Sequence, residues 1–435
     1  MTNEMEFFTF SFDLKDHPIN HVKLKQKKKY YLALEELVSR QLQNKVTAAC
    51  LEQYRIQFFK RSDPIEKPAS MERIVQSVIQ NRYRPWKKEY RCWLMCDAAL
   101  ILSDPERIGD TAANMGMYLS KRRQKKFYAL QHVLTDNHID PEQFAFAKGL
   151  ISQYRKNRAF AERPIRKMII TANMSAGKST LINALIGKKL ARTSQEVCTG
   201  NVCYFYNKPY EDGRIYLENE GYTIQAEQDE LKNISWELPV RTASYFRGSC
   251  CMSDRFCIID TPGVNSTVHR AHGTLSRDVL LGETYEKAVC VLNADKLGTE
   301  EELAHIRWVA QNVEKEKVIF VLNKVDDFKT ADDNLAESME AVKRDLLLAG
   351  FENPLICPVS AYFALLIKLK EYGDEMTEDE EDEYAFYVRK FQRPAYNLVK
   401  YYEGVREEEG EAEAVRMSKK CGLYGLEKIL FGGTI

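Results

Sequence analysis

The stretch TANMSAGKSTLINALIG, residues 171–187, constrains the fold of this chain more than any other segment. It continues the apolar run KMIIT and leads into STLINALI, a short apolar segment that ends at Gly187. A strand, a loop with Gly-Lys-Ser and a helix in this order form a phosphate-binding loop, because backbone N–H groups at the start of the helix point toward the phosphate. A strict motif has glycine at Ala172, and we expect the loop to accommodate one extra Cβ. The stretch predicts a P-loop domain that binds a nucleotide.

Two side chains of this loop have expected roles. Lys178 would reach the β- and γ-phosphates of the nucleotide, and the Ser179 hydroxyl would ligate Mg²⁺. The motif alone does not distinguish ATP from GTP. The residues expected to contact the nucleotide here are Asn173, Met174, Ser175, Ala176, Gly177, Lys178, Ser179 and Thr180.

From Arg166 onward, short apolar runs alternate with amphipathic helical segments. The runs are RKMIIT, RFCIID, AVCVLN, KVIFVLN and PLICPVS. Continuous apolar runs of this length, separated by helices, are typical of buried parallel strands. The fold class that we expect is a doubly wound, mostly parallel α/β sheet. An antiparallel excursion is expected in YEDGRIYLENEGYTI, with Asp212 and Gly213 forming a tight hairpin turn.

The DTPG sequence, residues 260–263, ends the run RFCIID. Asp260 can hold the Mg²⁺ shell, and the Gly263 amide can sense a γ-phosphate. A switch threonine that ligates Mg²⁺ and acts in catalysis should lie between the loop helix and the next run, NVCYFYN. Thr199 fits this position best, since the glycine after it lets the backbone approach the γ-phosphate. Thr193 is the competing candidate.

The NKVD sequence, residues 323–326, ends the run KVIFVL. Asp326 can accept hydrogen bonds from the ring imino hydrogen and the exocyclic amine of guanine, whereas adenine offers no such pair. Two such bonds of about 1.5 to 3 kcal/mol each give roughly a hundredfold preference or more. Asn323 and Lys324 complete this box, and Ser360 and Ala361 of VSA complete the site, with the Ala361 amide on the guanine carbonyl. The boxes lie where strands of a doubly wound sheet end, so we expect GTP.

The residues before this domain are predicted to be helical from about Lys28 to Phe160, because apolar side chains recur there at helical spacing. Asp140 and Pro141 are expected to start the helix that runs to Phe160. We therefore expect a helical N-terminal domain and a connecting helix before the nucleotide-binding domain. The boundaries are 1–137, 138–164 and 165–435, with an acidic helical insertion at about 370–416.

Charge and cysteine content bear on partners and location. The net charge is zero, but residues 1–166 hold 30 Lys and Arg against 19 Asp and Glu, which leaves 33 basic and 44 acidic residues for the rest. A basic front half favours an anionic partner or docking onto the acidic half. No apolar run reaches the length of a membrane span, and we expect no secretory leader. The eleven cysteines include no Cys-x-x-Cys pair, which favours reduced thiols in a cytoplasm.

Two charged clusters have alternative interpretations. SKRRQKKFY, residues 120–128, could bind anionic lipid or RNA, or could be a solvated helix face. Met115, Met117, Tyr118, Phe127 and Leu130 around it are expected in the core. DEMTEDEEDE, residues 374–383, has eight acids in ten residues and is interpreted as a solvated, poorly ordered loop.

With these motifs in order, the chain resembles the dynamin superfamily, and more closely the bacterial dynamin-like GTPases. The resemblance spans about residues 166–430 and rests on NMSAGKSTLINALIG, VCTGN, IIDTPGVNS, VLNADKLGTEEE, IFVLNKVDDF, FENPLICPVSA and CGLYGLEKIL. It implies a Mg²⁺-dependent enzyme that hydrolyses GTP to GDP and phosphate. It also implies a nucleotide-dependent homodimer of the GTPase domains, movement of the helical domain, and contact with a peripheral anionic membrane as one option.

Two departures from the family bear on catalysis. Val264 follows Gly263 where Ras-like enzymes have glutamine, and valine cannot hydrogen-bond water. The resemblance implies Ser175 in that role, with a monovalent cation nearby, although Met174 stands where many dynamins have glutamine. Intrinsic turnover should then be slow until a partner supplies charge or geometry, an effect of about 10³ to 10⁵ in related switches.

Three functions stay open at this point. The first is the dimerising GTPase, with only 74 residues after Ala361 for a stalk, so that the N-terminal helices form a short stalk or the chain is a fragment. The second is an RNA-linked regulatory switch, against which stands the lack of a recognisable RNA-binding module. The third is a scaffold that binds guanine nucleotide with little turnover. We expect no DNA partner.

Overall fold

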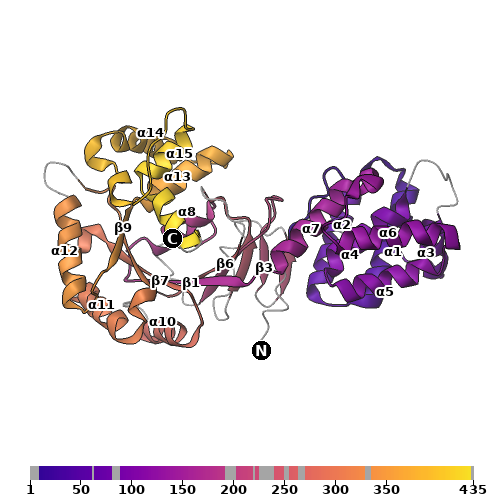
Figure 1. Cartoon of the computed structure of the whole chain (residues 1–435), viewed down its shortest axis with the longest axis horizontal. Helices are drawn as coiled ribbons and strands as arrows, with labels where there is room; N and C mark the ends of the chain where they lie inside the picture. The colour runs from indigo at the N-terminus through magenta and orange to yellow at the C-terminus, as the bar shows by residue number, and fades with distance from the viewer. Residues whose placement is uncertain are drawn as a thin grey trace. The chain divides into compact units, whose positions relative to one another are not determined.

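The computed structural model forms two compact units of chain (Figure 1). The first unit contains residues Met1–Arg163 and Lys208–Gln225, and the second contains Pro164–Asn207 and Ala226–Ile435. The chain therefore passes between the units three times. The structure describes residues 9–60, 63–80, 89–191, 202–218, 221–224, 240–248, 254–262, 270–328 and 335–432.

The first unit is a helical bundle around one helix that is buried on nearly all sides. This central helix is α4 (Tyr90–Leu102), in which every residue except Arg91 is buried. Helices hydrophobic all round are core helices, so the others pack about it. They are α1 (Leu24–Gln41), α2 (Lys45–Phe59), α3 (Met71–Gln80), α5 (Pro105–Gly116), α6 (Lys121–Thr135) and α7 (Lys148–Ala161), with the 3₁₀ turns η1 (Pro18–His21) and η2 (Pro141–Ala147).

A buried carboxylate in α4 ties the start of the chain to the bundle. Asp97 is fully buried, and the hydroxyl of Tyr54 donates to its Oδ1 at 3.1 Å and that of Tyr30 to its Oδ2 at 2.5 Å. His17 Nε2 lies 3.0 Å from Oδ2, while its Nδ1 accepts from the Ile19 N–H at 3.1 Å. Each polar group of this core network is thus satisfied, as buried polar groups must be.

Two expectations for the first unit need correction. The helix expected to begin at Pro141 is a 3₁₀ segment that breaks at Phe144 (φ −120°, ψ 37°), and regular α-helix begins only at Lys148. Asp140 does cap, accepting from the Glu142 N–H at 2.9 Å. Met117, expected in the core, is 74% exposed.

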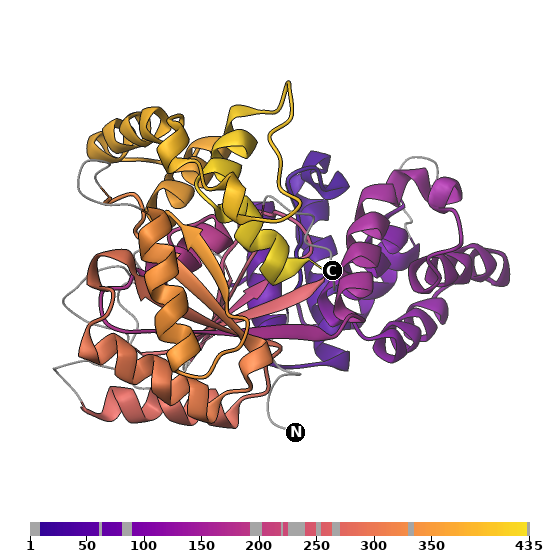
Figure 2. The same ribbon diagram turned by 60° about the vertical axis from the view of Figure 1, so that its left-hand side comes forward.

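The second unit is built on a mostly parallel sheet with helices on both faces (Figures 1 and 2). Its strands follow the order β5-β2-β6-β1-β7-β8-β9, and β2 alone among them runs antiparallel to its neighbour β6. The five expected apolar runs form the five consecutive parallel strands from β6 to β9. The bounds are β1 (Ile165–Ala172), β2 (Cys203–Asn207), β5 (Val240–Ser244), β6 (Arg255–Asp260), β7 (Lys287–Asn293), β8 (Val318–Asn323) and β9 (Leu355–Val359).

The helices of this unit fall into two layers and a C-terminal group. Helices α10 and α11 cover one face of the sheet, and α8 and α13 cover the other (Figure 1). This arrangement confirms the doubly wound α/β fold class. The bounds are α8 (Lys178–Ile186), α10 (Arg270–Gly282), α11 (Glu300–Asn312), α12 (Leu335–Leu348), α13 (Ala361–Tyr372), α14 (Glu378–Phe391), α15 (Glu413–Lys420) and α16 (Leu423–Phe431), with the 3₁₀ turns η3 (Ala294–Lys296), η4 (Lys315–Lys317), η5 (Pro394–Tyr396) and η6 (Val399–Tyr401).

The antiparallel hairpin lies within YEDGRIYLENEGYTI, as expected, but its turn is not at Asp212 and Gly213. Gly213 does adopt φ +71°, but it lies between β2 and β3 (Tyr216–Glu218), which do not pair with each other. The antiparallel hairpin joins β3 to β4 (Tyr222–Ile224), with Leu217 opposite Thr223. Asp212-Gly213 thus forms a turn, but the strands on either side of it do not pair, so the turn does not make a hairpin.

From Glu378 onward the acidic run is helical rather than a poorly ordered loop. Helix α14 begins at Glu378, where Thr377 and Glu380 form a reciprocal capping box, with the Glu380 N–H donating to Thr377 Oγ1 at 3.2 Å. Four acids in its first turn and Arg389 and Lys390 in its last turn complement the helix dipole. The same composition that suggested a solvated loop therefore stabilises a helix.

Candidate nucleotide-binding site

The predicted motifs meet at one edge of the sheet. Ile170 of β1 is paired in register with Asp260 of β6, and Asn293 of β7 with Asn323 of β8. These are parallel strands, so their carboxyl ends lie side by side. In an open α/β sheet, ligands bind in the crevice formed by the residues that follow these carboxyl ends.

The phosphate loop takes the backbone shape that its sequence predicts. Gly177 caps α8 at φ +83°, and a Cβ added to it would lie 2.3 Å from Asn323 Nδ2, so both conformation and space require glycine. Ser175 adopts φ +63° with an exposed side chain, a conformation that non-glycine residues adopt rarely and often at functional sites. Ala172 is buried at the end of β1, where its Cβ fits.

Lys178 and Asp260 form a buried ion pair beneath this loop. Lys178 Nζ donates to Asp260 Oδ1, while Oδ2 of the same carboxylate is buried and has no hydrogen-bond partner among the described residues. Burial raises the pKa of Asp260, and the Lys178 ammonium opposes that rise. The Lys178 ammonium could bind a phosphate, and the Asp260 oxygen that has no hydrogen bond could face a Mg²⁺ ion. The pair therefore fits a phosphate group with its bound Mg²⁺.

Two asparagines brace the loop, and one of them was not anticipated. Asn323 Nδ2 donates to the Ala176 carbonyl at 2.9 Å, and Asn293 Nδ2 donates to the Ser175 carbonyl at 3.3 Å. Both follow a Val-Leu sequence at the end of neighbouring strands, and that repeat of VLN was a signal for Asn293. Their shared effect is to hold the loop carbonyls back from the phosphate side.

The base side of the crevice holds a buried carboxylate. Asp326 is buried, its Oδ1 has no hydrogen-bond partner among the described residues, and Lys324 two residues earlier adopts φ +66°. Burial raises the pKa of Asp326, and a hydrogen bond from Ser360 opposes the rise. The Ala361 N–H, expected on the guanine carbonyl, donates to Asn323 Oδ1 at 3.0 Å. A guanine carbonyl would have to share or displace that bond.

The remaining predicted residues divide in two groups. Asn173, Met174, Ser179 and Thr180 lie in the loop or the first turn of α8, next to Lys178. Thr199, its competitor Thr193, Gly263 and Val264 lie outside the described residues, so their roles stay predictions.

The residues at this site fit a Mg²⁺ ion whose coordination shell is completed by nucleotide phosphates and water. No group of three or more His, Cys, Asp or Glu in the described segments could hold a metal alone. Mg²⁺ in nucleotide sites is commonly bound by one or two protein oxygens together with substrate phosphates and water. Ser179 and Asp260 are such oxygens, and the unused Oδ2 of Asp260 supports that assignment.

Two ionisable residues of α11 lie behind the loop. The Asn293 N–H donates to Glu302 Oε1 at 3.3 Å, and His305 Nε2 lies 3.3 Å from Thr171 Oγ1. Burial raises the pKa of Glu302 to about 7 and lowers the pKa of His305 to about 4. The support of the loop is therefore sensitive to pH.

Replacing Glu302 with glutamine should increase the free energy of unfolding at neutral pH. Between its ordinary pKa of 4.5 and about 7, folded Glu302 keeps a proton that the unfolded chain has lost, so wild-type stability falls as pH rises through that window. Glutamine does not titrate, and His305, with the opposite sign, is common to both proteins. Urea unfolding from about pH 5 to about pH 8 measures the difference. We expect it to grow with pH up to about 7 and then level off; a pH-independent difference would contradict the assignment.

The loop, the brace and the two carboxylates define a P-loop nucleotide-binding domain. A family model described as the dynamin family matches residues 169–325, which include the phosphate loop and end one residue before Asp326 of the NKVD box. Over these residues the chain matches the dynamin family, in agreement with the resemblance noted in its motifs.

Individual relatives match part of the chain. A protein of Arabidopsis thaliana described as a probable transmembrane GTPase FZO-like, chloroplastic, is 31% identical over 207 residues, 46% of this chain and 20% of its own length. A protein of Caldicellulosiruptor sp. (strain Rt8B.4), described as an uncharacterized protein in the xynA 3'region, is 26% identical over 250 residues. These residues are 56% of this chain and 58% of the relative's own length. The chain thus covers less than two thirds of either relative.

Among solved structures, a chain of an oligomerised bacterial dynamin pair aligns with 89% of this chain and 59% of its own, at 15% identity and a TM-score of 0.37. The described part of this chain contains no helix with the length and apolar character needed to cross a membrane.

Proposed function

We propose that the chain is a Mg²⁺-dependent GTPase of the dynamin-like type that hydrolyses GTP to GDP and phosphate. The observation that carries this is the presence, at one edge of the sheet, of a phosphate-side cation, Lys178, and a buried base-side carboxylate, Asp326, whose Oδ1 has no hydrogen-bond partner within the described segments. A buried acceptor without a partner costs about 1 to 3 kcal/mol, which guanine would recover with its imino and amino hydrogens. The same carboxylate would repel the acceptor nitrogen of adenine.

The phosphate end assigns roles to residues of the loop. Lys178 would turn from Asp260 to the β- and γ-phosphates, and Asp260 and Ser179, with Thr199, would hold Mg²⁺, which neutralises phosphate charge when bound. The loop amides of residues 173–180 would bind the phosphate oxygens. Gly263 would sense the γ-phosphate, and Asn323, Lys324, Ser360 and Ala361 would enclose the base.

Catalysis requires a group that orients water, and we assign it to Ser175. Its side chain is exposed and its carbonyl is held by Asn293, so the hydroxyl is presented from a fixed backbone. A monovalent cation is proposed beside it to supply positive charge. An exposed group of this kind works best once a second molecule covers it, which favours activation by a nucleotide-dependent homodimer.

Turnover per molecule should rise with protein concentration. If two GTPase domains complete each other's site, hydrolysis per molecule increases by at least about tenfold as the dimer forms, and by up to the roughly 10³ to 10⁵ that partner-supplied groups provide. Phosphate release measured over a dilution series, with the Ser175→Ala variant as comparison, tests this. Concentration-independent turnover that RNA stimulates would favour the RNA-linked switch, and GTP binding without phosphate release would favour the scaffold.

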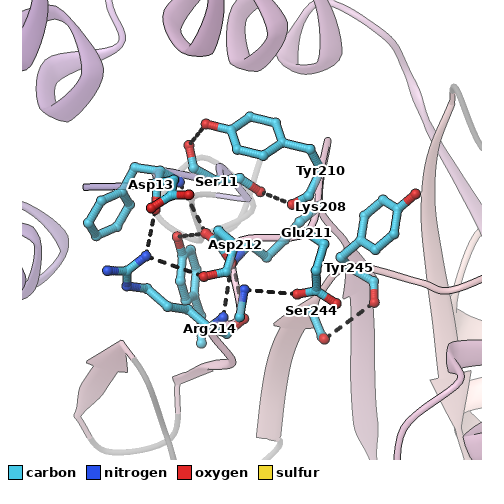
Figure 3. Close-up of polar contacts among 12 residues, drawn as sticks. Ser11, Asp13, Lys208, Tyr210, Glu211, Asp212, Arg214, Ser244 and Tyr245 are labelled. Atoms are coloured by element: carbon cyan, nitrogen blue, oxygen red, sulfur yellow. Dashed lines mark hydrogen bonds and ion pairs between the residues drawn. The ribbon is translucent and has the colours of Figure 1, made fainter. Parts of the chain in front are cut away.

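We further propose that nucleotide state is passed to the helical unit through residues 208–218. These residues leave β2, the strand that follows the Thr199 segment, and belong to the first unit by their contacts. There Asp212 accepts from Lys208 Nζ at 2.5 Å and from the Phe12 N–H at 3.0 Å, and Arg214 donates to the Phe12 carbonyl at 2.6 Å (Figure 3). Lys208 and Asp212 have fully buried side chains.

Replacing Asp212 with alanine should destabilise the helical unit while leaving nucleotide binding intact. Removing Asp212 takes the carboxylate away from the buried Lys208 ammonium, which costs about 3 to 5 kcal/mol, whereas replacing both residues by apolar ones is close to neutral. Hydrogen exchange of residues 9–14 should therefore accelerate in Asp212→Ala and recover in the double variant Lys208→Met, Asp212→Leu. Equal protection in all three proteins would show that the pair does not anchor this segment.

A peripheral anionic membrane is the partner that we propose for the basic cluster at the start of α6. Lys121, Arg122, Arg123, Lys125 and Lys126 are all exposed, and exposed Met117 precedes them. Cations at a helix N-terminus oppose the helix dipole, so the cluster does not serve helix stability. Anionic headgroups would neutralise it, at about 1 kcal/mol per basic residue. The localisation that fits this cluster is the cytoplasm, with peripheral binding to the membrane surface.

A further inference from the structure

Two side chains of the acidic insertion hold the backbone around Asp326. Lys390 Nζ, at the end of α14, donates to the Asp326 carbonyl at 2.5 Å and to the Phe328 carbonyl at 3.0 Å. The Tyr396 hydroxyl, in η5, donates to the same Phe328 carbonyl at 3.0 Å, and this bond is buried. The loop that follows β8 is therefore fastened to the insertion at two of its carbonyl groups.

The Lys390 ammonium is itself held in place. It lies 4.5 Å from the centroid of the Tyr396 ring and 5.9 Å from that of the Phe386 ring, and aromatic faces attract cations at such distances. The next residue, Phe391, is fully buried and stacks on Phe363 of α13 with ring centroids 5.0 Å apart. The end of α14 is thus anchored to α13, and Lys390 reaches the loop from a fixed position.

The backbone of this loop needs external support. Lys324 adopts φ +66°, and a residue other than glycine in this region costs about 1 to 3 kcal/mol and persists only where its surroundings hold it. The Asp327 N–H closes the turn by donating to the Lys324 carbonyl at 3.1 Å. Oδ1 of Asp326 has no hydrogen-bond partner in the described part of the chain, so the backbone that Lys390 holds has a direct effect on where that oxygen lies.

A cation in the last turn of a helix also complements the helix dipole, which is the simpler role for Lys390. Arg389 supplies the same charge at the same helix end, but its side chain is exposed. Lys390 is half-buried and directs its ammonium at two carbonyls of the base-side loop. The dipole accounts for the charge of Lys390 but not for these contacts.

We propose that Lys390, supported by Tyr396, is a positioning residue for guanine, which makes the acidic insertion part of the base site. This inference rests on the proposed function and deepens it. Lys390 acts through Asp326 by fixing the backbone that carries the carboxylate. Hydrogen bonds weaken steeply with poor distance and angle, so a displaced carboxylate would accept the two guanine hydrogens poorly.

The Lys390→Met variant tests the proposal, because methionine keeps an unbranched stem and removes the ammonium. The measurement is the ratio of the affinities for GDP and for inosine diphosphate, whose base keeps the imino hydrogen of guanine and lacks the exocyclic amine. We expect a wild-type ratio of roughly ten or more, the worth of one hydrogen bond to a charged acceptor. In Lys390→Met the ratio should fall by about fivefold, whereas a loss of phosphate contacts or of stability would weaken both nucleotides equally.

Two further variants complete the experiment. Arg389→Met removes a cation from the same helix end and should keep the wild-type ratio. Tyr396→Phe removes one donor to the Phe328 carbonyl and keeps the ring beside Lys390, so the ratio should fall by about twofold, as loss of part of one neutral hydrogen bond predicts. This milder variant decides the question if Lys390→Met does not fold. Competition of each diphosphate against fluorescent GDP measures the affinities.

The outcomes separate the inference from the function beneath it. A ratio that falls in Lys390→Met, falls less in Tyr396→Phe and is unchanged in Arg389→Met supports the inference. A wild-type ratio in Lys390→Met and Tyr396→Phe, or an equal fall in Arg389→Met, overturns it while the base assignment stands. If the wild type does not prefer GDP, or if Asp326→Asn keeps the wild-type ratio, the base assignment fails, and the inference fails with it.

Discussion

The Lys178→Ala variant is expected to lose GTP hydrolysis by about a thousandfold. Lys178 is the one predicted cation of the loop, and its ammonium lies against Asp260 at the site where the phosphates would enter. Removing a preorganised charged donor from a buried site lowers kcat by about 10² to 10³, and lost phosphate binding adds to that. Steady-state phosphate release at saturating GTP measures the loss.

A matched control is Lys317→Ala. Lys317 precedes β8 at the opposite edge of the sheet and pairs with exposed Glu314. This variant should keep wild-type turnover, because an exposed pair contributes little. The Lys178 variant also leaves Asp260 without its cation, so a thermal unfolding measurement must accompany the assay. A folded Lys178→Ala protein with wild-type turnover would remove Lys178 from the phosphate site.

The Asp326→Asn variant is expected to exchange guanine for xanthine preference. The carboxylate accepts two hydrogens from guanine, whereas an asparagine side chain offers one acceptor and one donor, which match the imino hydrogen and the second carbonyl of xanthine. Loss of two charge-assisted bonds should weaken GTP by roughly a hundredfold or more. Competition of GTP and XTP for a fluorescent nucleotide measures the exchange.

The neighbouring acid provides the control. Asp327 lies next to Asp326 but is exposed, and Asp327→Asn should leave the guanine preference unchanged. If the Asp326 variant still prefers GTP by the wild-type ratio, another group reads the base. If both variants lose GTP equally, the effect is one of local charge rather than of base reading.

The strands and the motifs at their ends could be predicted because each depends on residues close together in the chain. RKMIIT and KVIFVLN each contain a short continuous apolar stretch, MII and VIFVL, which favours a buried strand where such stretches alternate with helical segments. Gly177 and Lys178 are recognised within a motif of eight residues. The order of the motifs then fixes the edge of the sheet at which they meet.

Other features depend on partners distant in the chain and could not be predicted. Residues 208–218 belong to the helical unit because Asp212 meets Phe12, 200 positions earlier. The acidic run forms α14 because Lys189 and Lys370 pair with Glu380 and Glu381, which offsets repulsion that composition alone suggested. A local sequence pattern gives no information on ion pairs between residues that are distant in the chain.

The bracing role of Asn293 belongs to the same class. Its side chain contacts Ser175 from a different strand, and a sequence pattern assigns asparagine at a strand end to a turn or a cap as readily. Asn323, by contrast, was assigned to the base, whereas its observed contacts are with the phosphate loop and the Ala361 amide. The motif singles out Asn323 but does not indicate these two contacts, and its role at the base stays a prediction.

The central claim is that a single crevice holds a triphosphate against Lys178 and a guanine against Asp326. Crystals grown with Mg²⁺ and a non-hydrolysable GTP analogue test it most directly. The account predicts the γ-phosphate beside Lys178 Nζ, with Asp260 facing the metal, and both guanine donors on the Asp326 carboxylate. Nucleotide bound anywhere else on the chain, or a base that makes no contact with Asp326, would contradict it.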